Sequence, residues 1–442
     1  MTATTTLNDS LEKLRHLQPS SPKRNASLGS SADWYSYYAG YADGFVKDIV
    51  GVLPAEAMTI LDPWNGSGTT TAVATLHSLR SKGFDLNPAA VVIAKARILH
   101  SDVAGSIAPL TEEILGSPDL EAAKTSGSSD LLGTWLAAGS AAYIRAIEIR
   151  IRQLLIGADA GRVLGSVNEI SSLAALFYLG LFRSVRTLLA RFVGSNPTWI
   201  RRKVEGRERI RPSQETVNDL FSRAMMELTK LVEAASHAYD DQHCPCDVEI
   251  GSSLNLPLES GTIDAVITSP PYCTRIDYAV ATLPELAVLG LRADELKDLR
   301  DKMIGTPTIA SLSQDEIPPE CDRAADLIEE VSTHGSKASS GYYRRFFSRY
   351  FDGMHRSLSE IRRVAKDGSP AVLVVQDSFY KEVHVDLAGI IEDMAGTVGW
   401  TPLARHDFPV IPRRNYATIN PRSRVYRERT EATESVLVLG AS

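Results

Sequence analysis

The fold is decided by the stretch Thr59-Ile60-Leu61-Asp62-Pro63-Trp64-Asn65-Gly66-Ser67-Gly68-Thr69-Thr70. Its apolar start predicts a short strand, its glycines predict a turn, and the residues that follow predict a helix. Glycine lets the backbone pass close under a ligand, and the N-terminus of the next helix presents free N–H groups. The spacing differs from the dinucleotide-binding motif, and no lysine follows as in a P-loop. The stretch predicts a ligand-binding strand-turn-helix unit, and an ordinary corner of the same shape is the alternative.

A second strand is predicted to end at Gly83-Phe84-Asp85, after which Asn87 precedes a helix that runs to about Leu99. An acid at the tip of the second strand of a βαβ unit is placed to accept both ribose hydroxyls of an adenosine-containing ligand. We therefore expect Asp85 to bind a ribose. A capping or turn role for Asp85 is the alternative.

A third motif, Ser269-Pro270-Pro271-Tyr272, follows the apolar residues 265–268 and points to methylation of an exocyclic amino group on a nucleobase. Such an amine shares its lone pair with the ring, so hydrogen-bond acceptors must draw its hydrogens out of the ring plane. The two prolines stiffen the loop and lack N–H donors, which leaves the Ser269 hydroxyl and the carbonyls as acceptors. Tyr272 offers a ring face to a base taken out of its stack. A proline-rich exit from a strand is the alternative interpretation.

Together the three motifs resemble the amino-group (N4-cytosine or N6-adenine) DNA methyltransferases that use S-adenosylmethionine. The resemblance implies an α/β fold, a Rossmann-like methyltransferase sheet with a helical insertion. It also implies that residues 269–272 are catalytic; the form that begins with Ser is commoner among the N4-cytosine enzymes. Trp64 stands where the family has Phe, and the acid that the family places after Gly251 is missing. The cofactor loop comes first in this chain, so an aromatic segment before it, residues 34–45, is a candidate for cofactor contact.

The resemblance and the motifs give one set of expected cofactor-binding residues. These are Tyr38, Asp62, Pro63, Trp64, Gly66, Ser67, Gly68, Thr69, Asp85, Asn87 and Ser252.

Charge is distributed unevenly along the chain. The formal net charge is −7, yet residues 183–211 contain nine Lys or Arg against two Glu, and six arginines lie within residues 413–429. Basic clusters on an acidic protein favour phosphate binding, although charge runs are most often solvated faces. We expect double-stranded DNA as the partner, and the expected contacts are Arg201, Arg202, Lys203, Arg275, Arg413 and Arg414.

Composition is typical of a cytoplasmic enzyme. The 442 residues suffice for two or three domains, and we see neither a membrane span nor a signal peptide. The four cysteines imply no disulfide framework. His243-Cys244-Pro245-Cys246 resembles half of a zinc site, but no second ligand pair is visible, so no metal is expected.

Four segments are expected. Residues 1–31 form a flexible N-terminus, residues 32–104 the cofactor-binding half, and residues 105–246 a helical insertion suited to target recognition. Residues 247–442 form the catalytic half, with a loop insertion near 290–341 that is expected to lie over the base pocket. Helical periodicity marks residues 135–156, 171–192 and 214–237, and further strands are expected around Val248 and at residues 265–268, 371–375 and 435–439.

The resulting prediction is a site-specific DNA methyltransferase that acts on an exocyclic amine, with N4 of cytosine preferred over N6 of adenine. Alternatives are an RNA base N-methyltransferase with the same cofactor and a catalytically silent DNA-binding protein of the same fold. Protein-glutamine methyltransferases are disfavoured because they carry Asn where Ser269 stands. The sequence leaves open whether restriction or defence proteins accompany the chain.

Overall fold

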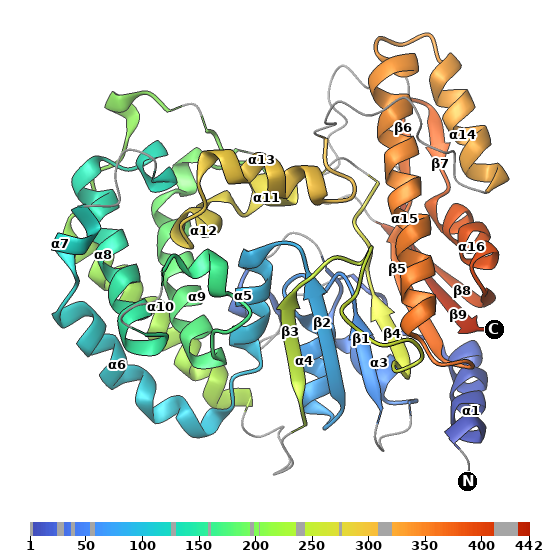
Figure 1. Ribbon diagram of the computed structural model, residues 1–442, viewed down its shortest axis with the longest axis horizontal. Coiled ribbons are helices and arrows are strands. Elements are labelled where there is room, and N and C mark those ends of the chain that lie inside the picture. The colour runs from blue at the N-terminus through green and yellow to red at the C-terminus, as the bar shows by residue number, and fades with distance from the viewer. Residues whose placement is uncertain are drawn as a thin grey trace.

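A seven-stranded sheet forms the centre of the computed structural model (Figure 1). The structure describes residues 3–23, 31–36, 40–53, 58–124, 130–157, 161–194, 199–202, 204–235, 244–273, 276–307, 321–410 and 432–442. The strand order is β3-β2-β1-β4-β5-β9-β8. The strands are β1 (Thr59–Asp62), β2 (Arg80–Asp85), β3 (Cys246–Ile250), β4 (Ala265–Thr268), β5 (Pro370–Gln376), β8 (Trp400–Val410) and β9 (Ala432–Ala441). All neighbours pair in parallel except β9, which runs antiparallel to both β5 and β8. The predicted Rossmann-like methyltransferase sheet is confirmed.

The strand order indicates where a ligand would bind, at the carboxyl ends of the central strands. From β1 the chain moves outward to β2 and β3, and it then returns to the other side of β1 to form β4. Leu61 of β1 is therefore in register with Lys82 on one side and Val266 on the other. Ligands bind outside the carboxyl ends of the strands at such a reversal point. The predicted motifs at residues 62–70, 85 and 269–272 all follow these carboxyl ends.

Helices cover both faces of the sheet. On one face, α3 (Asp43–Val50) and α4 (Thr69–Leu76) pack against Ile60, Ile267 and Val374. On the other face, α14 (Asp322–Thr333), α15 (Arg344–Val364) and α16 (Leu387–Thr397) pack against Val266 and Leu373. Burial on both faces explains why the parallel strands are continuous apolar runs. Among the described residues, no helix combines the length and the apolar character needed to cross a bilayer.

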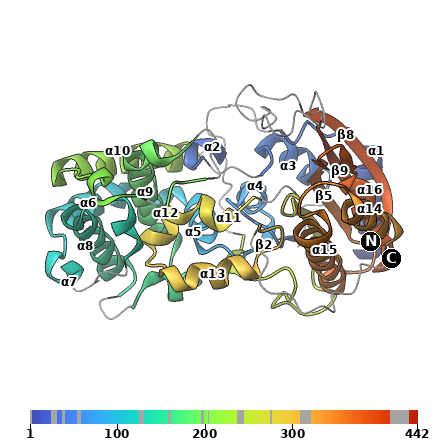
Figure 2. The same cartoon turned by 90° about the horizontal axis from the view of Figure 1, so that it is seen from above.

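The helical insertion lies at one end of the molecule, and α14–α16 lie at the other (Figure 2). It contains α6 (Ala104–Gly116), α7 (Leu120–Lys124), α8 (Ala138–Leu155), α9 (Ser172–Leu188) and α10 (Gln214–Ala235). The last three match the three predicted helices. Their aromatic core includes the fully buried Trp135, Tyr178 and Phe221. Helix α5 (Pro88–Arg97), which follows β2, packs against α9 and so joins the insertion to the sheet.

Two segments predicted to lack regular structure contain helices. Residues 1–31 include α1 (Ala3–His16), whose Leu14 is 1% exposed and packs in the core against β5, β8 and β9. The insertion near 290–341 contains α13 (Ala293–Lys302) and the whole of α14, with residues 308–320 outside the described range. In α14, Ala324, Leu327, Ile328 and Val331 form an apolar stripe at helical spacing, which the prolines upstream of it obscured.

Short elements complete the structure near the site. They are α2 (Ser31–Trp34), α11 (Tyr278–Ala281), α12 (Leu283–Val288) and the antiparallel pair β6 (Ser378–Tyr380) and β7 (Val383–Val385).

Candidate active site

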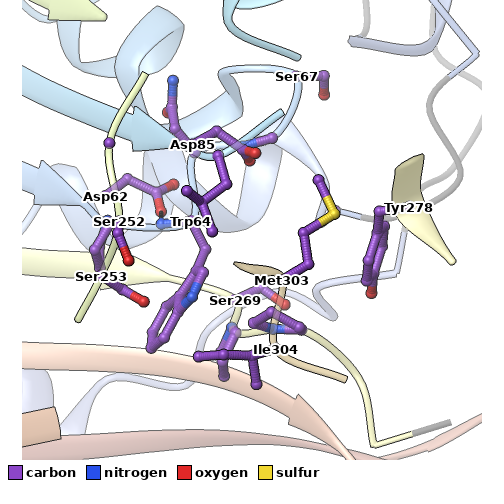
Figure 3. Close-up of a pocket in the computed structure, with 18 of the residues that line it drawn as sticks. Asp62, Trp64, Ser67, Asp85, Ser252, Ser253, Ser269, Tyr278, Met303 and Ile304 are labelled. Atoms are coloured by element: carbon purple, nitrogen blue, oxygen red, sulfur yellow. Dashed lines mark hydrogen bonds between the residues drawn. The ribbon is translucent and has the colours of Figure 1, made fainter. Parts of the chain in front are cut away.

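The three predicted motifs line one cavity at the carboxyl ends of β1, β2 and β4 (Figure 3). Its empty volume is about 880 Å³, including the part open to solvent. It is lined by residues 62–67, Thr69 and Asp85, and by residues 269–272 and 302–304. A lining built from the ends of several strands and the loops that follow them is typical of a small-molecule site.

The glycine turn is held in a shape that only glycine readily adopts. Gly66 and Gly68 have positive φ angles of 50° and 77°. A Cβ atom on Gly68 would lie 2.6 Å from the Cβ of Ala94, so the turn packs directly on α5. Arg97 of α5 donates to the Ser67 carbonyl over 2.7 Å. The backbone of the turn is therefore fixed before any ligand binds.

Asp62 connects three elements beneath the cavity. Its carboxylate accepts from Tyr41 Oη at 3.0 Å, from Thr268 Oγ1 at 2.5 Å and from the backbone N–H of Trp64 at 3.2 Å. Burial raises the pKa of Asp62, and these hydrogen bonds oppose the rise. Since Tyr41 belongs to the aromatic segment and Thr268 ends β4, Asp62 joins the glycine turn to both.

Asp85 lies across the cavity floor from Asp62. Its two carboxylate oxygens accept from the backbone N–H groups of Gly66, at 2.9 Å, and Asn87, at 2.8 Å. Burial raises the pKa of Asp85 to about 6, against the effect of these two bonds. A carboxylate has about four lone-pair sites, so Asp85 retains acceptor capacity toward the cavity.

The loop 269–272 is anchored on several sides. Ser269 Oγ donates its hydrogen to the carbonyl of Val374 in β5 at 3.0 Å, and this leaves its oxygen lone pairs to accept. Tyr350 Oη donates to the Pro271 carbonyl at 2.7 Å. The Tyr272 N–H donates to Tyr278 Oη at 3.3 Å.

Most of the expected cofactor residues share this cavity, but some do not. Asp62, Pro63, Trp64, Gly66, Ser67, Thr69, Asp85 and Ser252 all line it, as do the four residues of the catalytic motif. Gly68 and Asn87 do not. Gly68 shapes the turn, and Asn87 caps α5 by accepting from the Ala89 N–H at 3.1 Å. Tyr38 lies outside the described residues, but Gly40 and Tyr41, from the same aromatic segment, line the cavity.

Several lining residues were missed by sequence reasoning. Tyr278, Lys302, Met303 and Ile304 reach the cavity from α11 and from the end of α13. Nothing in their local pattern marks them, and Lys302, Met303 and Ile304 belong to a segment that reads as a polar insertion. Only the expectation that this insertion lies over a base pocket indicated a contribution from it.

The expected DNA contacts are only partly described. Arg201 pairs with Glu208 at 2.9 Å and lies 5.4 Å from the Phe192 ring centre, while Arg202 lies over the half-exposed Trp199 at 5.6 Å. Lys203, Arg275, Arg413 and Arg414 lie outside the described residues.

Not every arginine of the basic cluster is available to DNA. Arg186 forms an ion pair with Glu285, which is fully buried, and Arg183 pairs with Glu227. Those two arginines support the packing of α9 rather than a basic surface.

The half zinc motif is likewise described only in part. Cys244 donates to the Ser78 carbonyl and Cys246 accepts from Ser81, whereas His243 lies outside the described residues.

The fold is a Rossmann-like methyltransferase sheet, and the cavity lies at the carboxyl ends of its central strands. No family model matches the chain. Over 199 residues the chain is 25% identical to the type II methyltransferase M.AvaI of Nostoc sp. (strain PCC 7120 / SAG 25.82 / UTEX 2576). The aligned residues cover 42% of this chain and 41% of that protein. Over 296 residues the chain is 24% identical to the type II methyltransferase M.BsoBI of Geobacillus stearothermophilus, covering 62% and 55%. The chain thus spans about half the length of these relatives.

Proposed function

We propose that this chain is an S-adenosylmethionine-dependent DNA methyltransferase that modifies an exocyclic amine, with N4 of cytosine preferred over N6 of adenine. The observation that carries the proposal is that Ser269 and Asp85 line the same cavity. One motif suits an adenosine-containing cofactor and the other suits a base amine. The similarity to two type II methyltransferases supports the same class of reaction.

The residues present fit the cofactor. Gly66 lines the cavity without a Cβ atom, and Asp85 retains acceptor sites for ribose hydroxyls. The half-buried Trp64 adds an apolar face to the lining. When bound, S-adenosylmethionine supplies an electrophilic methyl group on a positively charged sulfur.

The chain's own residues would orient the target amine. Tyr272 stacks on a base that has left the duplex. The Ser269 oxygen, whose own hydrogen is committed to Val374, accepts one amine hydrogen. The carbonyl of Pro270 accepts the other, since the Pro271 carbonyl already accepts from Tyr350. With both hydrogens drawn out of the ring plane, the nitrogen lone pair is freed for direct attack on the methyl group.

Duplex DNA is the proposed partner because aromatic rings hold two arginines at the surface of the helical insertion. Arg201 over Phe192 and Arg202 over Trp199 have their guanidinium planes supported, and Trp199 is 47% exposed. A guanidinium group stacked on a ring can direct its N–H edges to phosphate oxygens, and Arg201 shares these donors with Glu208. We propose that the second basic cluster, which includes Arg413 and Arg414, also contacts DNA.

The test is transfer of a radiolabelled methyl group from the cofactor to duplex DNA in a single turnover. Ser269→Ala is expected to slow transfer by about 10²–10³-fold, as removal of one positioned hydrogen-bonding group does elsewhere. Binding of cofactor and DNA should be retained.

Ser378→Ala is the matched control, because Ser378 also donates to a carbonyl of this loop, that of Cys273 at 3.1 Å, without lining the cavity. It should remain much faster than Ser269→Ala. Full activity in Ser269→Ala, or labelling of RNA in place of DNA, would contradict the proposal.

A further inference from the structure

A buried carboxylate faces the hydroxyl of the aromatic residue in the catalytic motif. Glu434, near the start of β9, is 8% exposed, and its Oε1 lies 3.5 Å from Tyr272 Oη. This distance is at the long end of hydrogen bonding. Catalytic hydrogen bonds are often long in an unliganded enzyme and shorten when substrate binds. Base stacking alone needs no such partner, because it uses the ring face of Tyr272 and not its hydroxyl.

The placement of Glu434 follows from the pairing of β9 with β5. Glu434 is in register with Gln376, two residues beyond Val374, whose carbonyl accepts from Ser269. The start of β9 is fixed by Asp377, which follows β5. Its N–H donates to the Thr433 carbonyl at 3.0 Å, and its Oδ1 accepts from the Thr433 N–H at 2.5 Å. The β5–β9 pair therefore reaches both ends of the catalytic motif.

We propose that Glu434 is a positioning residue that fixes the ring of Tyr272 for base stacking through the Tyr272 hydroxyl. This inference rests on the proposed function of the same cavity and adds a residue to it. Glu434 touches neither the base nor the cofactor in this role. It restricts rotation of the ring, so that the face is presented when the base enters.

The surroundings of Glu434 make this hydrogen bond sensitive to pH. Burial raises the pKa of Glu434 to about 7, and the bond from Tyr272 and the charge of Lys23 oppose the rise. Its cross-strand neighbours are neutral, Gln376 on β5 and Phe408 on β8. An ionised carboxylate accepts a stronger hydrogen bond than a protonated carboxyl group does. The restraint on Tyr272 is therefore complete above this pKa and weakens as the pH falls through about 7.

The first arm of the test is spectroscopic and does not depend on activity. The protein is labelled with ¹³C at the ring carbon bonded to oxygen in its 15 tyrosines, and the Tyr272 signal is identified by its disappearance in Tyr272→Phe. That signal should shift with a midpoint near pH 7 in the wild type, and the step should vanish in Glu434→Gln. Glu382→Gln, at an exposed glutamate, should leave the step in place. A wild-type signal without this step, or a step that persists in Glu434→Gln, overturns the proposal.

The second arm measures methyl transfer to duplex DNA. Glu434→Gln and Tyr272→Phe should each slow transfer at high pH by about tenfold, and the double variant should be no slower than the slower single variant. Both should lack the fall in rate through pH about 7 that is expected of the wild type. Reductions that multiply in the double variant overturn the proposal. A wild type that methylates nothing contradicts the proposed function instead, and the spectroscopic arm then decides on Glu434.

Discussion

At the scale of single residues, Asp85 has a structural role beside the ribose-binding role proposed for it. Its carboxylate holds the glycine turn through the Gly66 N–H and the start of α5 through the Asn87 N–H. Because burial raises its pKa to about 6, the group changes charge within a range where the protein can be studied. The ribose-binding role is therefore open to a titration.

Cofactor affinity should fall as the pH decreases through about 6, because a protonated Asp85 has less acceptor capacity toward ribose hydroxyls. Asp85→Asn should bind more weakly at high pH, by about 1.5–3 kcal/mol for each charge-assisted bond removed, and should show no such fall. Calorimetry with S-adenosylmethionine across this range is the measurement. If folded Asp85→Asn binds the cofactor with the affinity and the pH profile of the wild type, then Asp85 stabilises the turn and does not bind the ribose.

At the scale of elements, α9 is joined to the segment that follows the catalytic motif by a buried ion pair. Arg186 of α9 donates to both carboxylate oxygens of Glu285 in α12 and to the Ala281 carbonyl at the end of α11. Tyr35 Oη also donates to Glu285, at 2.5 Å. These contacts hold the helical insertion against α11 and α12, and Tyr278 of α11 lines the cavity.

Arg186→Ala should lower the free energy of unfolding by about 3–5 kcal/mol, because it leaves the fully buried Glu285 without its cation. Arg183→Ala, on the same helix, removes an arginine whose partner Glu227 is 47% exposed, and it should cost at most about 1 kcal/mol. Urea unfolding of the two variants gives the comparison. Similar decreases in both would mean that the Glu285 pair contributes no more than a surface pair.

The elements also show which parts of the fold and of the site can be predicted from the sequence. Strands such as β4 and β5 were predictable because a strand buried on both faces must be apolar throughout. Strand β8 was not, since exposed and partly buried residues alternate along it and it contains two prolines. The loop motifs were predictable because their chemistry requires specific residue types. Lys302, Met303 and Glu434 were not, because only tertiary structure brings α13 and β9 to the catalytic motif.

At the scale of the whole molecule, the net charge of −7 requires DNA to meet a local basic surface. The Arg201/Arg202 double alanine variant should bind duplex DNA more weakly, because fewer phosphates are neutralised. The log–log salt slope should decrease by about 0.9 for each phosphate that the variant no longer neutralises. Cofactor affinity should be unchanged, and Arg183→Ala is the control. An unaltered slope would place the DNA-binding surface elsewhere.

We propose that the protein methylates an exocyclic amine in DNA with the residues of this cavity. The most direct measurement is mass spectrometry of nucleosides from the DNA of cells that express the wild type or Ser269→Ala. We expect N4-methylcytosine with the wild type and its near absence with Ser269→Ala. N6-methyladenine in its place would contradict the proposed preference for cytosine, but it would still support methylation of an exocyclic amine. A wild type that leaves both amines unmodified, or one that methylates a ring carbon, would contradict the claim itself.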